Sequence, residues 1–366
     1  MSSTTIGNDG AGKLKINIDG NEIHMDEFKN MVVYEELHNI IPYAVFEFIV
    51  LEEKLPMFMK VDAKIEVKLI FHDISKRFKF SLRNFNFERH GKASYLVNVE
   101  ALLDATNYYG NEFKQELFKD KKSYEVMGSL KNIETQIETD PTDDKQDWIR
   151  ANTTEKQFMD YLYQYCYKPN DIILCGLKAD GKLKVSSVKT ILKKPFKIFT
   201  NNINNGDIFY ADLKFKSKAD ILDVRLSPLR KVRWFQPPTH KILEGDISAK
   251  SLFTGRDYDV LYKYHPFPLM LDNMNTHENY CFTQKNNIVL RNRLEKYTVT
   301  LVIPQANKTF NFELLDLVKL KETTLTKNKP SIHIEGKYIV KKIVYYYNQS
   351  GFQKLEVTLM RDYFVK

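Results

Sequence analysis

The sequence has few cysteines and no long apolar run. Its three cysteines, Cys166, Cys175 and Cys281, are an odd number without the spacing of a metal site, so we expect reduced or buried thiols and no disulfide framework. No stretch approaches the roughly 20 apolar residues that a membrane span needs. The opening residues, MSSTTIGNDGAGKLKI, contain no apolar core of signal-peptide length. These absences predict a soluble protein that is made in the cytosol and does not contact a membrane.

Motifs for catalysis and for cofactor binding are missing as well. There is no phosphate-binding glycine loop, no G-x-S-x-G elbow and no H-E-x-x-H pair. The eight histidines are scattered singly, which favours surface or structural roles over metal binding. One acidic cluster lacks the glycine and the terminal glutamate of a calcium loop, and we interpret it as a solvated linker: Glu138, Asp140, Asp143, Asp144 and Asp147. The sequence therefore predicts no catalytic residue, no cofactor and no metal site.

Aromatic residues and alternating strand patterns are abundant. The chain has 24 Phe and 21 Tyr, and 43% of its residues are hydrophobic while 28% are charged, as in a folded protein. In KIEVKLIF, the apolar Ile65, Val67 and Leu69 alternate with charged residues, which predicts a strand with one buried face. PYAVFEFIVLE is nearly all apolar, as in a strand covered on both faces. Five to seven such strands up to about residue 105 predict a small antiparallel β-barrel or sandwich.

The pattern changes after residue 105. SYEVMGSLKNIETQIE places apolar residues at helical spacing, with Ser123 as N-cap, and predicts a first helix. TTEKQFMDYLYQYC predicts a second helix, because Thr154 and Gln157 have the spacing of a capping box. DIILCGLKADGKLKVSSV predicts a hairpin that turns at residues 179–181. This segment is therefore expected to be a small α+β unit.

Strand patterns return after residue 200 and end in a long hairpin across residues 348–351. The intervening residues 228–289 are the least regular part of the chain. We predict a mainly β fold: two tube-like antiparallel β-barrels, a two-helix and hairpin domain, and an irregular insertion. The expected domains are a flexible leader at 1–12, a first β-barrel at 13–105, an α+β domain at 106–200, a second β-barrel at 201–227 and 290–366, and a surface insertion at 228–289.

A run of basic residues interleaved with aromatics is a candidate site for nucleic-acid binding. It comprises Lys214, Lys216, Lys218, Arg225, Arg230, Lys231 and Arg233, next to Phe215, Trp234 and Phe235. Stacking on aromatic rings is one way to hold single strands. The three lysines fall two residues apart, however, which is the spacing of the outward face of one strand. We favour a solvated strand face, and nucleic-acid binding stays open as an alternative.

The order of these parts carries a family resemblance. A β-rich unit is followed by a helix, a loop with Trp148, the helix NTTEKQFMDYLY, a hairpin, and a second β-rich unit that ends in YIVKKIVYYY and LEVTLMRD. This order resembles the central baseplate hub proteins of contractile-tailed phages. It is also similar to the hub portion of type VI secretion spike proteins and to the tail hubs of long-tailed siphophages. The resemblance covers about residues 13–366.

The resemblance implies a structural function that depends on the shape of the assembly and needs no active site. In hubs of this family two related β-barrels lie side by side in one subunit, so a homotrimer forms a ring of six similar barrels. Such a ring adapts a six-fold tail tube to a three-fold spike and lines the path of genome delivery. The implied partners are copies of the chain, a tail tube protein, a central spike or tail-lysozyme protein, baseplate wedge proteins and a tape measure protein, with DNA only in transit. The implied location is the tail baseplate of the virion.

The closing hairpin is expected to complete the second barrel and to join an inter-subunit sheet, because unpaired strand edges need covering. The predicted contacts with other subunits or partners are Phe215, Lys216, Lys218, Trp234, Phe235, Tyr345, Tyr347, Leu355 and Val357. Three alternatives stay open beside the hub: a tail-associated enzyme that degrades the cell wall, another baseplate component, and the hub of a phage-derived injection system.

Overall fold

The structure, a computed structural model of the chain, describes most of the sequence. The described residues are 13–60, 62–71, 74–110, 113–202, 207–217, 229–236, 241–248, 250–256, 264–271, 287, 290–304, 312–321 and 334–363. The predicted leader at 1–12 lies outside these residues. Within them, no helix is long and apolar enough to cross a membrane.

The N-terminal part is a run of antiparallel strands with three short helical turns. Its strands are β1 Lys13–Ile18, β2 Asn21–Glu22, β3 Phe28–Glu36, β4 Tyr43–Leu51, β5 Lys64–Phe71, β6 Ile74–Arg89 and β7 Ser94–Leu103. The helical turns are η1 Glu52–Lys54, α1 Pro56–Met59 and α2 Thr106–Tyr109. Ile65, Val67 and Leu69 are buried as their alternation predicts. The first turn uses left-handed backbone at Asp19 and Gly20, whose φ angles are 48° and 84°.

The middle part mixes helices with two small sheets. Its elements are β8 Lys114–Lys121, α3 Ser123–Gly128, β9 Glu134–Glu138, β10 Gln146–Thr153, α4 Glu155–Tyr165, β11 Ile173–Leu177, β12 Lys182–Ser187 and α5 Val188–Leu192. Strands β8 and β10 pair, and β12 lies between β11 and β9. The predicted capping box of α4 is confirmed: Thr154 accepts from Gln157 N–H, and the Gln157 side chain accepts from Thr154 N–H.

The prediction of one long first helix in this part is wrong. Helix α3 ends at Gly128, and Glu134–Glu138 instead forms strand β9, parallel to β12. The cause is competition between periods: Ile133 and Ile137 fit helical spacing, but Thr135 and Ile137 fit strand spacing equally well. The adjacent Gly128 and Ser129 favour the end of the helix.

The C-terminal part consists mainly of strands. Its elements are β13 Lys197–Thr200, β14 Ile208–Phe209, β15 Asp212–Ser217, β16 Leu229–Gln236, β17 Lys241–Ser248, β18 Tyr264–Leu271, α7 Arg291–Leu294, β19 Tyr297–Pro304, β20 Leu317–Lys321, β21 Gly336–Asn348 and β22 Gly351–Arg361. The segment 228–289, predicted to be irregular, contains the three-stranded sheet β17-β16-β18. Prolines and short apolar runs obscured its period in the sequence.

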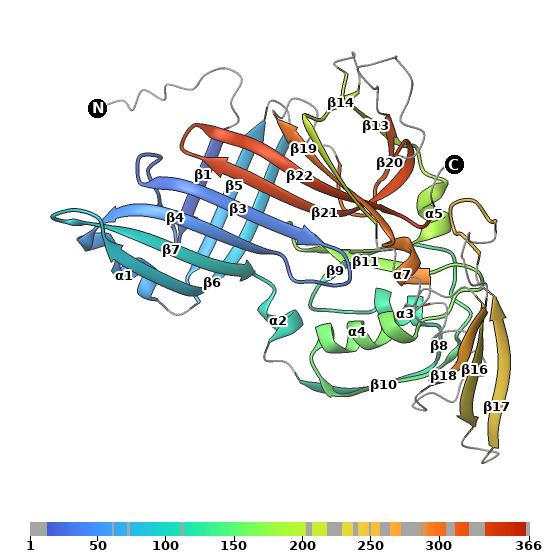
Figure 1. Cartoon of the computed structure of the whole chain (residues 1–366). Coiled ribbons are helices and arrows are strands. Elements are labelled where there is room, and N and C mark those ends of the chain that lie inside the picture. Colours follow the sequence, from blue (N-terminus) through green and yellow to red (C-terminus); the bar gives the residue numbers. More distant parts are fainter. Residues whose placement is uncertain are drawn as a thin grey trace.

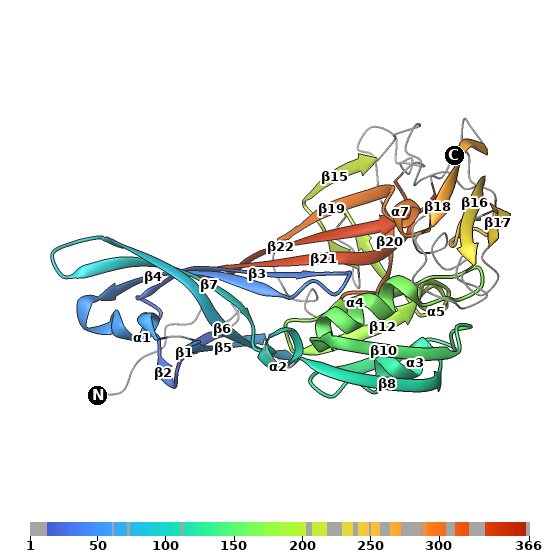
Figure 2. The same ribbon diagram turned by 90° about the horizontal axis from the view of Figure 1, so that it is seen from below.

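One 14-stranded sheet joins the two β-rich parts. Its main path runs β14-β13-β20-β21-β3-β4-β7-β6-β5-β1-β2, and β22, β19 and β15 extend from β21. Figures 1 and 2 show β21 and β3 side by side, with the helical middle part beneath one end of the sheet. The predicted mainly β fold with an α+β middle unit is confirmed.

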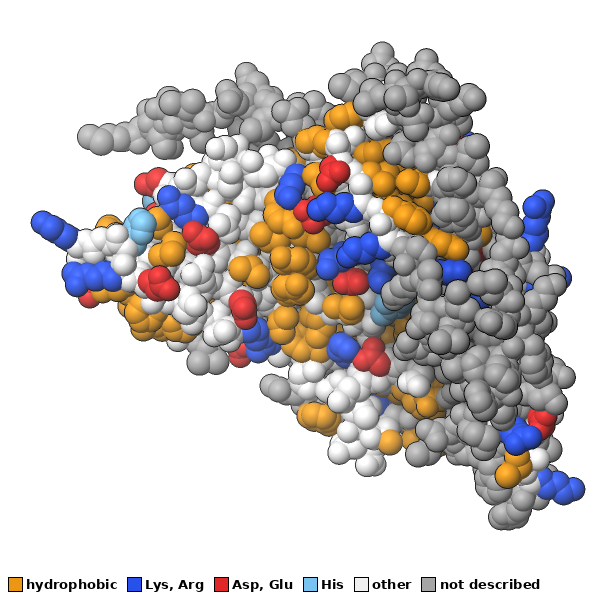
Figure 3. All heavy atoms as spheres, in the orientation of Figure 1, with side chains coloured by type: hydrophobic (Ala, Val, Ile, Leu, Met, Phe, Trp, Pro, Cys, Tyr) orange, Lys and Arg blue, Asp and Glu red, His pale blue; other side chains and the backbone are white. Residues whose placement is uncertain are grey.

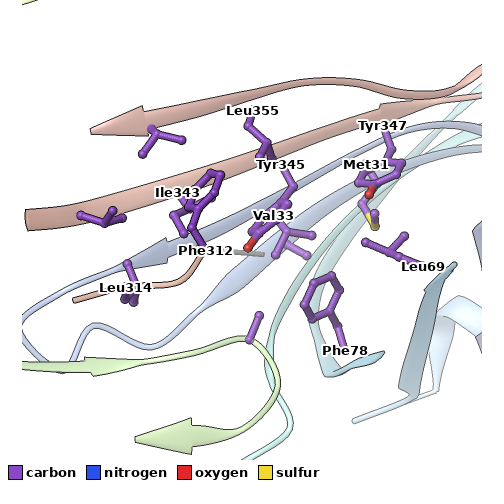
Figure 4. Packing of buried hydrophobic residues seen from close by; sticks show 14 of the residues in the cluster. Met31, Val33, Leu69, Phe78, Phe312, Leu314, Ile343, Tyr345, Tyr347 and Leu355 are labelled. Carbon is purple, nitrogen blue, oxygen red and sulfur yellow. The ribbon is translucent and has the colours of Figure 1, made fainter. Parts of the chain in front are cut away.

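The buried residues form two hydrophobic clusters. One runs through both β-rich parts; Figure 4 shows Val33 and Phe78 from the N-terminal strands beside Tyr345 and Leu355 from the closing hairpin. The second cluster lies in the middle part and contains Trp148 and several residues of α4. The two β-rich parts therefore share a core, whereas the middle part has one of its own.

Candidate interaction surfaces

The closing hairpin finds its pairing partners inside the subunit. On one side, β22 pairs with β19 from Lys354 to Arg361. On the other side, β21 pairs with β20 at its start and with β3 from Lys342 to Asn348. The hairpin thus lies inside the large sheet, and its expected role in completing a second β-barrel stays a prediction. Its expected place in an inter-subunit sheet stays a prediction; within the subunit, β3, β19 and β20 occupy the long edges of its two strands.

The structure places four predicted contact residues in the core of the subunit. Tyr345, Tyr347, Leu355 and Val357 are each at most 2% exposed. Their alternation in the sequence marks the face of the hairpin that is turned toward the core shared with the N-terminal strands (Figure 4). In the isolated subunit these side chains therefore serve packing.

Strand β15 carries two of the predicted subunit or partner contacts, Phe215 and Lys216. Among the described strands it pairs only with β19. Lys214 and Lys216 are exposed, as predicted for a solvated strand face, whereas Phe215 packs against the core and stacks on Tyr297 at 6.4 Å between ring centroids. Of the remaining predicted contacts, Lys218 lies outside the described residues, as do the side chains of the β16 positions Trp234 and Phe235.

The outer face of the large sheet is partly apolar. Strand β4, expected to be covered on both faces, buries Phe46 and Phe48 on one face only, while Val45 on the other face is half-buried. On that outer face Tyr34 and Tyr43 stack at 4.3 Å. Figure 3 shows hydrophobic side chains gathered over the region where β21, β3 and β4 run side by side.

His38 lies where the three parts of the chain meet. It follows β3 in left-handed backbone with a φ of 69°. Its Nδ1 lies 2.7 Å from the hydroxyl of Tyr163 in α4, and its Nε2 lies 2.5 Å from Oε1 of Glu295, just after α7. Lys341 Nζ of β21 approaches the other oxygen of Glu295 at 2.8 Å. One histidine and one carboxylate thus connect the N-terminal, middle and C-terminal parts.

The environment of Glu295 favours its ionised form. Burial raises the pKa of this carboxyl, but the hydrogen bond with His38 and the charge of Lys341 outweigh burial and lower the pKa from 4.5 to about 2. The carboxylate therefore contributes stability that is present above about pH 4.5 and is lost as the pH falls toward 2.

We expect Glu295→Gln to lower the midpoint of urea unfolding above about pH 4.5, because the amide cannot replace the charged contacts. The pKa shift corresponds to on the order of 3 kcal/mol of stability. The difference from the unaltered protein should shrink as the pH approaches 2. Urea titrations across this window measure it, with Glu22→Gln, at an exposed position of β2, as control. If the unfolding midpoints of the variant and of the unaltered protein differ by the same amount at every pH in this window, the role of Glu295 is contradicted.

A second junction lies beneath the sheet. Glu35 of β3 is only 5% exposed, and burial raises its pKa. Its Oε1 accepts from Ala179 N–H in the β11–β12 turn at 2.8 Å, and its Oε2 accepts from the Tyr345 hydroxyl at 3.3 Å. Lys76 Nζ of β6 donates to the same hydroxyl at 3.1 Å. The three parts are therefore held together by specific polar contacts as well as by apolar packing.

The acidic cluster is only partly a solvated linker. Asp144 is 1% exposed and accepts from Ser123 N–H at 2.9 Å, Thr142 Oγ1 at 2.6 Å and Tyr167 N–H at 2.8 Å. This carboxylate fixes the start of α3 and the end of α4 against each other, which corrects the prediction for this residue. In the described residues no group of three or more His, Cys, Asp or Glu side chains is arranged to hold a metal ion.

Sequence reasoning missed His38, Glu295 and Glu35 as junction residues. For Glu35 a signal was present, because it continues the buried alternation of Met31 and Val33 along β3. A charged residue at a buried strand position needs a polar partner. For His38 and Glu295 no local signal exists, since 257 positions separate them.

Comparisons with known proteins give fold relatives only at the level of structure. No family model and no curated protein matches the sequence. A tail protein from Neisseria meningitidis has 11% identity and a TM-score of 0.63, covering 96% of this chain and 97% of that chain. The 43 kDa tail protein of prophage MuSo2 from Shewanella oneidensis has 10% identity and a TM-score of 0.64, with 96% and 99% covered.

A third relative belongs to a secretion machine. This E. coli component of the type VI secretion system, described as structurally similar to the T4 tail proteins gp27 and gp5, has 6% identity and a TM-score of 0.53. The match covers 95% of this chain and 76% of that chain. The chain thus has the fold of these phage tail proteins and of this type VI secretion component, which confirms the predicted resemblance at the level of the fold.

Proposed function

We propose that the protein is a structural component of a phage tail and serves as its baseplate hub. The observation that carries this proposal is the end-to-end match with two phage tail proteins, each of which is covered almost completely. The shared core of the two β-rich parts supports it further. A rigid pair of β units within one subunit is what a three-subunit ring needs to present six similar units to a tail tube.

The proposed assembly is a homotrimeric ring in the baseplate of the virion. A six-fold tail tube protein would dock on one side and a three-fold spike or tail-lysozyme protein on the other. Wedge and tape measure proteins are further proposed partners, and DNA would pass only in transit. We propose no catalytic activity and no cofactor for this chain. The same fold in a type VI secretion component supports a phage-derived injection system as the second candidate.

Strand β15 is the proposed element of subunit contact. Among the described strands it forms an edge of the large sheet, and such an edge offers backbone N–H and C=O groups to a neighbouring strand. The exposed lysines discourage indiscriminate pairing, as lysines commonly do on edge strands. A specific neighbour in a closed ring would cover this edge.

Negative-stain images of the purified protein test the ring, alone and mixed with a candidate tube protein. We expect three-fold outlines around a central hole. Lys216→Pro should reduce the rings to monomers, because proline removes an N–H and disturbs strand pairing at the edge. Lys216→Thr, which keeps the N–H and favours a strand, is the matched control. Rings that persist with proline would exclude β15 as the contact, and monomers from the unaltered protein in both samples would contradict the ring itself.

A further inference from the structure

Phe196 is an exposed aromatic ring with two lysines beside it. It lies between α5 and β13, and 41% of its surface is exposed. Lys319 of β20 holds its Nζ 5.8 Å from the ring centroid, and Lys337 of β21 holds its Nζ at 5.6 Å. Cation–π contacts of this length position both ammonium groups around one ring at the protein surface.

The two lysines face each other across the sheet. Lys319 and Lys337 are directly opposite residues in the antiparallel pair of β20 and β21. Like charges at directly opposite positions destabilise a sheet. Within the part of the chain that the structure describes, neither lysine forms an ion pair. The arrangement concentrates positive charge that no described carboxylate neutralises.

Neighbouring lysines show that this is a local exception. Lys197, next to Phe196, lies 3.3 Å from a carboxylate oxygen of Asp316, and Lys184 lies 3.5 Å from the other oxygen of the same carboxylate. The sequence thus provides acidic partners on the side of β13 and β20 that faces the middle part. On the side that carries Phe196, positive charge is left for an external partner.

The geometry also indicates which anion fits. A nucleic acid held by stacking needs a free aromatic face. Here two ammonium groups already lie within 6 Å of the Phe196 ring centroid, so the surface offers two positive charges beside an exposed apolar ring. Ammonium groups form charge-assisted hydrogen bonds with carboxylates, and the exposed ring suits an apolar side chain between them.

We propose that Phe196, Lys319 and Lys337 form a docking site for an acidic polypeptide segment of a partner protein, with its carboxylates on the two lysines. The site is argued from charge and geometry, and it does not depend on the tail role proposed above. Its occupancy would also remove the repulsion between the two lysines, so the subunit should be stabilised when the segment binds.

Fluorescence anisotropy with a fluorescein-labelled oligoglutamate peptide tests the site on the full chain. The double variant Lys319→Gln/Lys337→Gln should weaken binding about tenfold, since each exposed ion pair contributes modestly and two are lost. Phe196→Leu should weaken it less. The matched control is Lys15→Gln/Lys68→Gln, which removes the same charge from another pair of directly opposite lysines, in β1 and β5, and should leave the affinity unchanged.

Three results would overturn the proposal. Equal losses in the two double variants would mean that only net charge matters. A single-stranded DNA oligonucleotide that binds more tightly than the peptide, and depends on the same two lysines, would assign the site to nucleic acid. A lower melting temperature of Lys319→Gln/Lys337→Gln would give the lysines a structural role, whereas relief of repulsion predicts an unchanged or higher one.

Discussion

A chain that ends after Asn348 is expected to lose the fold of both β-rich parts. The truncation removes β22, which pairs with β21 on one side and with β19 on the other. Strands β15 and β19 then lose their connection to the rest of the large sheet, because within the described strands β22 provides it. Strand β21 loses β22 and keeps its pairing with β20 and β3 on the other side.

The energetic cost of this truncation matches the stability of a whole domain. Leu355, Val357, Leu359 and Met360 of β22 are fully buried. Burial of each such side chain contributes about 1.5–3 kcal/mol, so their loss removes roughly 6–12 kcal/mol. A typical domain is stable by only about 5–15 kcal/mol. Because the two β-rich parts share one core, the damage should extend to β3 and to the N-terminal strands.

Hydrogen exchange of the soluble fraction measures the extent of this damage. Amides of β3 should lose protection in the truncated protein, whereas a chain that ends after Tyr363 should keep it. The shared core makes this expectation more severe than the sequence suggested, since a separate second barrel would have spared the N-terminal part. Retained protection of β3 beside a lost C-terminal sheet would show that the two parts fold independently.

Local signals in the sequence were sufficient for several elements. The capping box at Thr154 and Gln157 located the start of α4, and alternation around the turn at Gly351 located the closing hairpin. These features depend on interactions between residues close in the chain, so their pattern is visible without the fold. Strand β9 was not predicted, because its apolar residues fit both helical and strand spacing. Pairing with β12 selects the strand.

The pairing of strands that lie far apart in the chain could not be predicted from the sequence. The junction of β21 with β3 joins residues more than 300 positions apart, and no local pattern specifies that pairing. The predicted contact residues in the hairpin illustrate the consequence. Tyr345 and Leu355 were conspicuous as apolar residues near the chain end, but only the neighbouring strands reveal that they face the core. Apolar alternation identifies a face that is covered without saying whether the subunit or a partner covers it.

Phe158→Asp is expected to unfold the middle part. Phe158 of α4 is 2% exposed and stacks on Phe118 of β8 at 5.5 Å between ring centroids. Loss of a buried phenylalanine costs about 3–5 kcal/mol, and an unpaired buried carboxylate adds several more. The sum reaches the range of a whole domain's stability. Since the middle part has a hydrophobic cluster of its own, the effect should be strongest there.

Tryptophan fluorescence reports this unfolding directly. Trp148 is 1% exposed and contacts Tyr161 of α4, and Trp234→Phe leaves Trp148 as the single tryptophan. In that background, Phe158→Asp should shift the emission of Trp148 to longer wavelength as water reaches the ring. Ile149→Asp makes the same kind of change at a residue that is 62% exposed, one position from Trp148. It should alter stability by no more than about 0.5 kcal/mol. Unchanged emission in Phe158→Asp would mean that α4 does not hold this core together, whereas a shift in both variants would mean that any charge near Trp148 disturbs it.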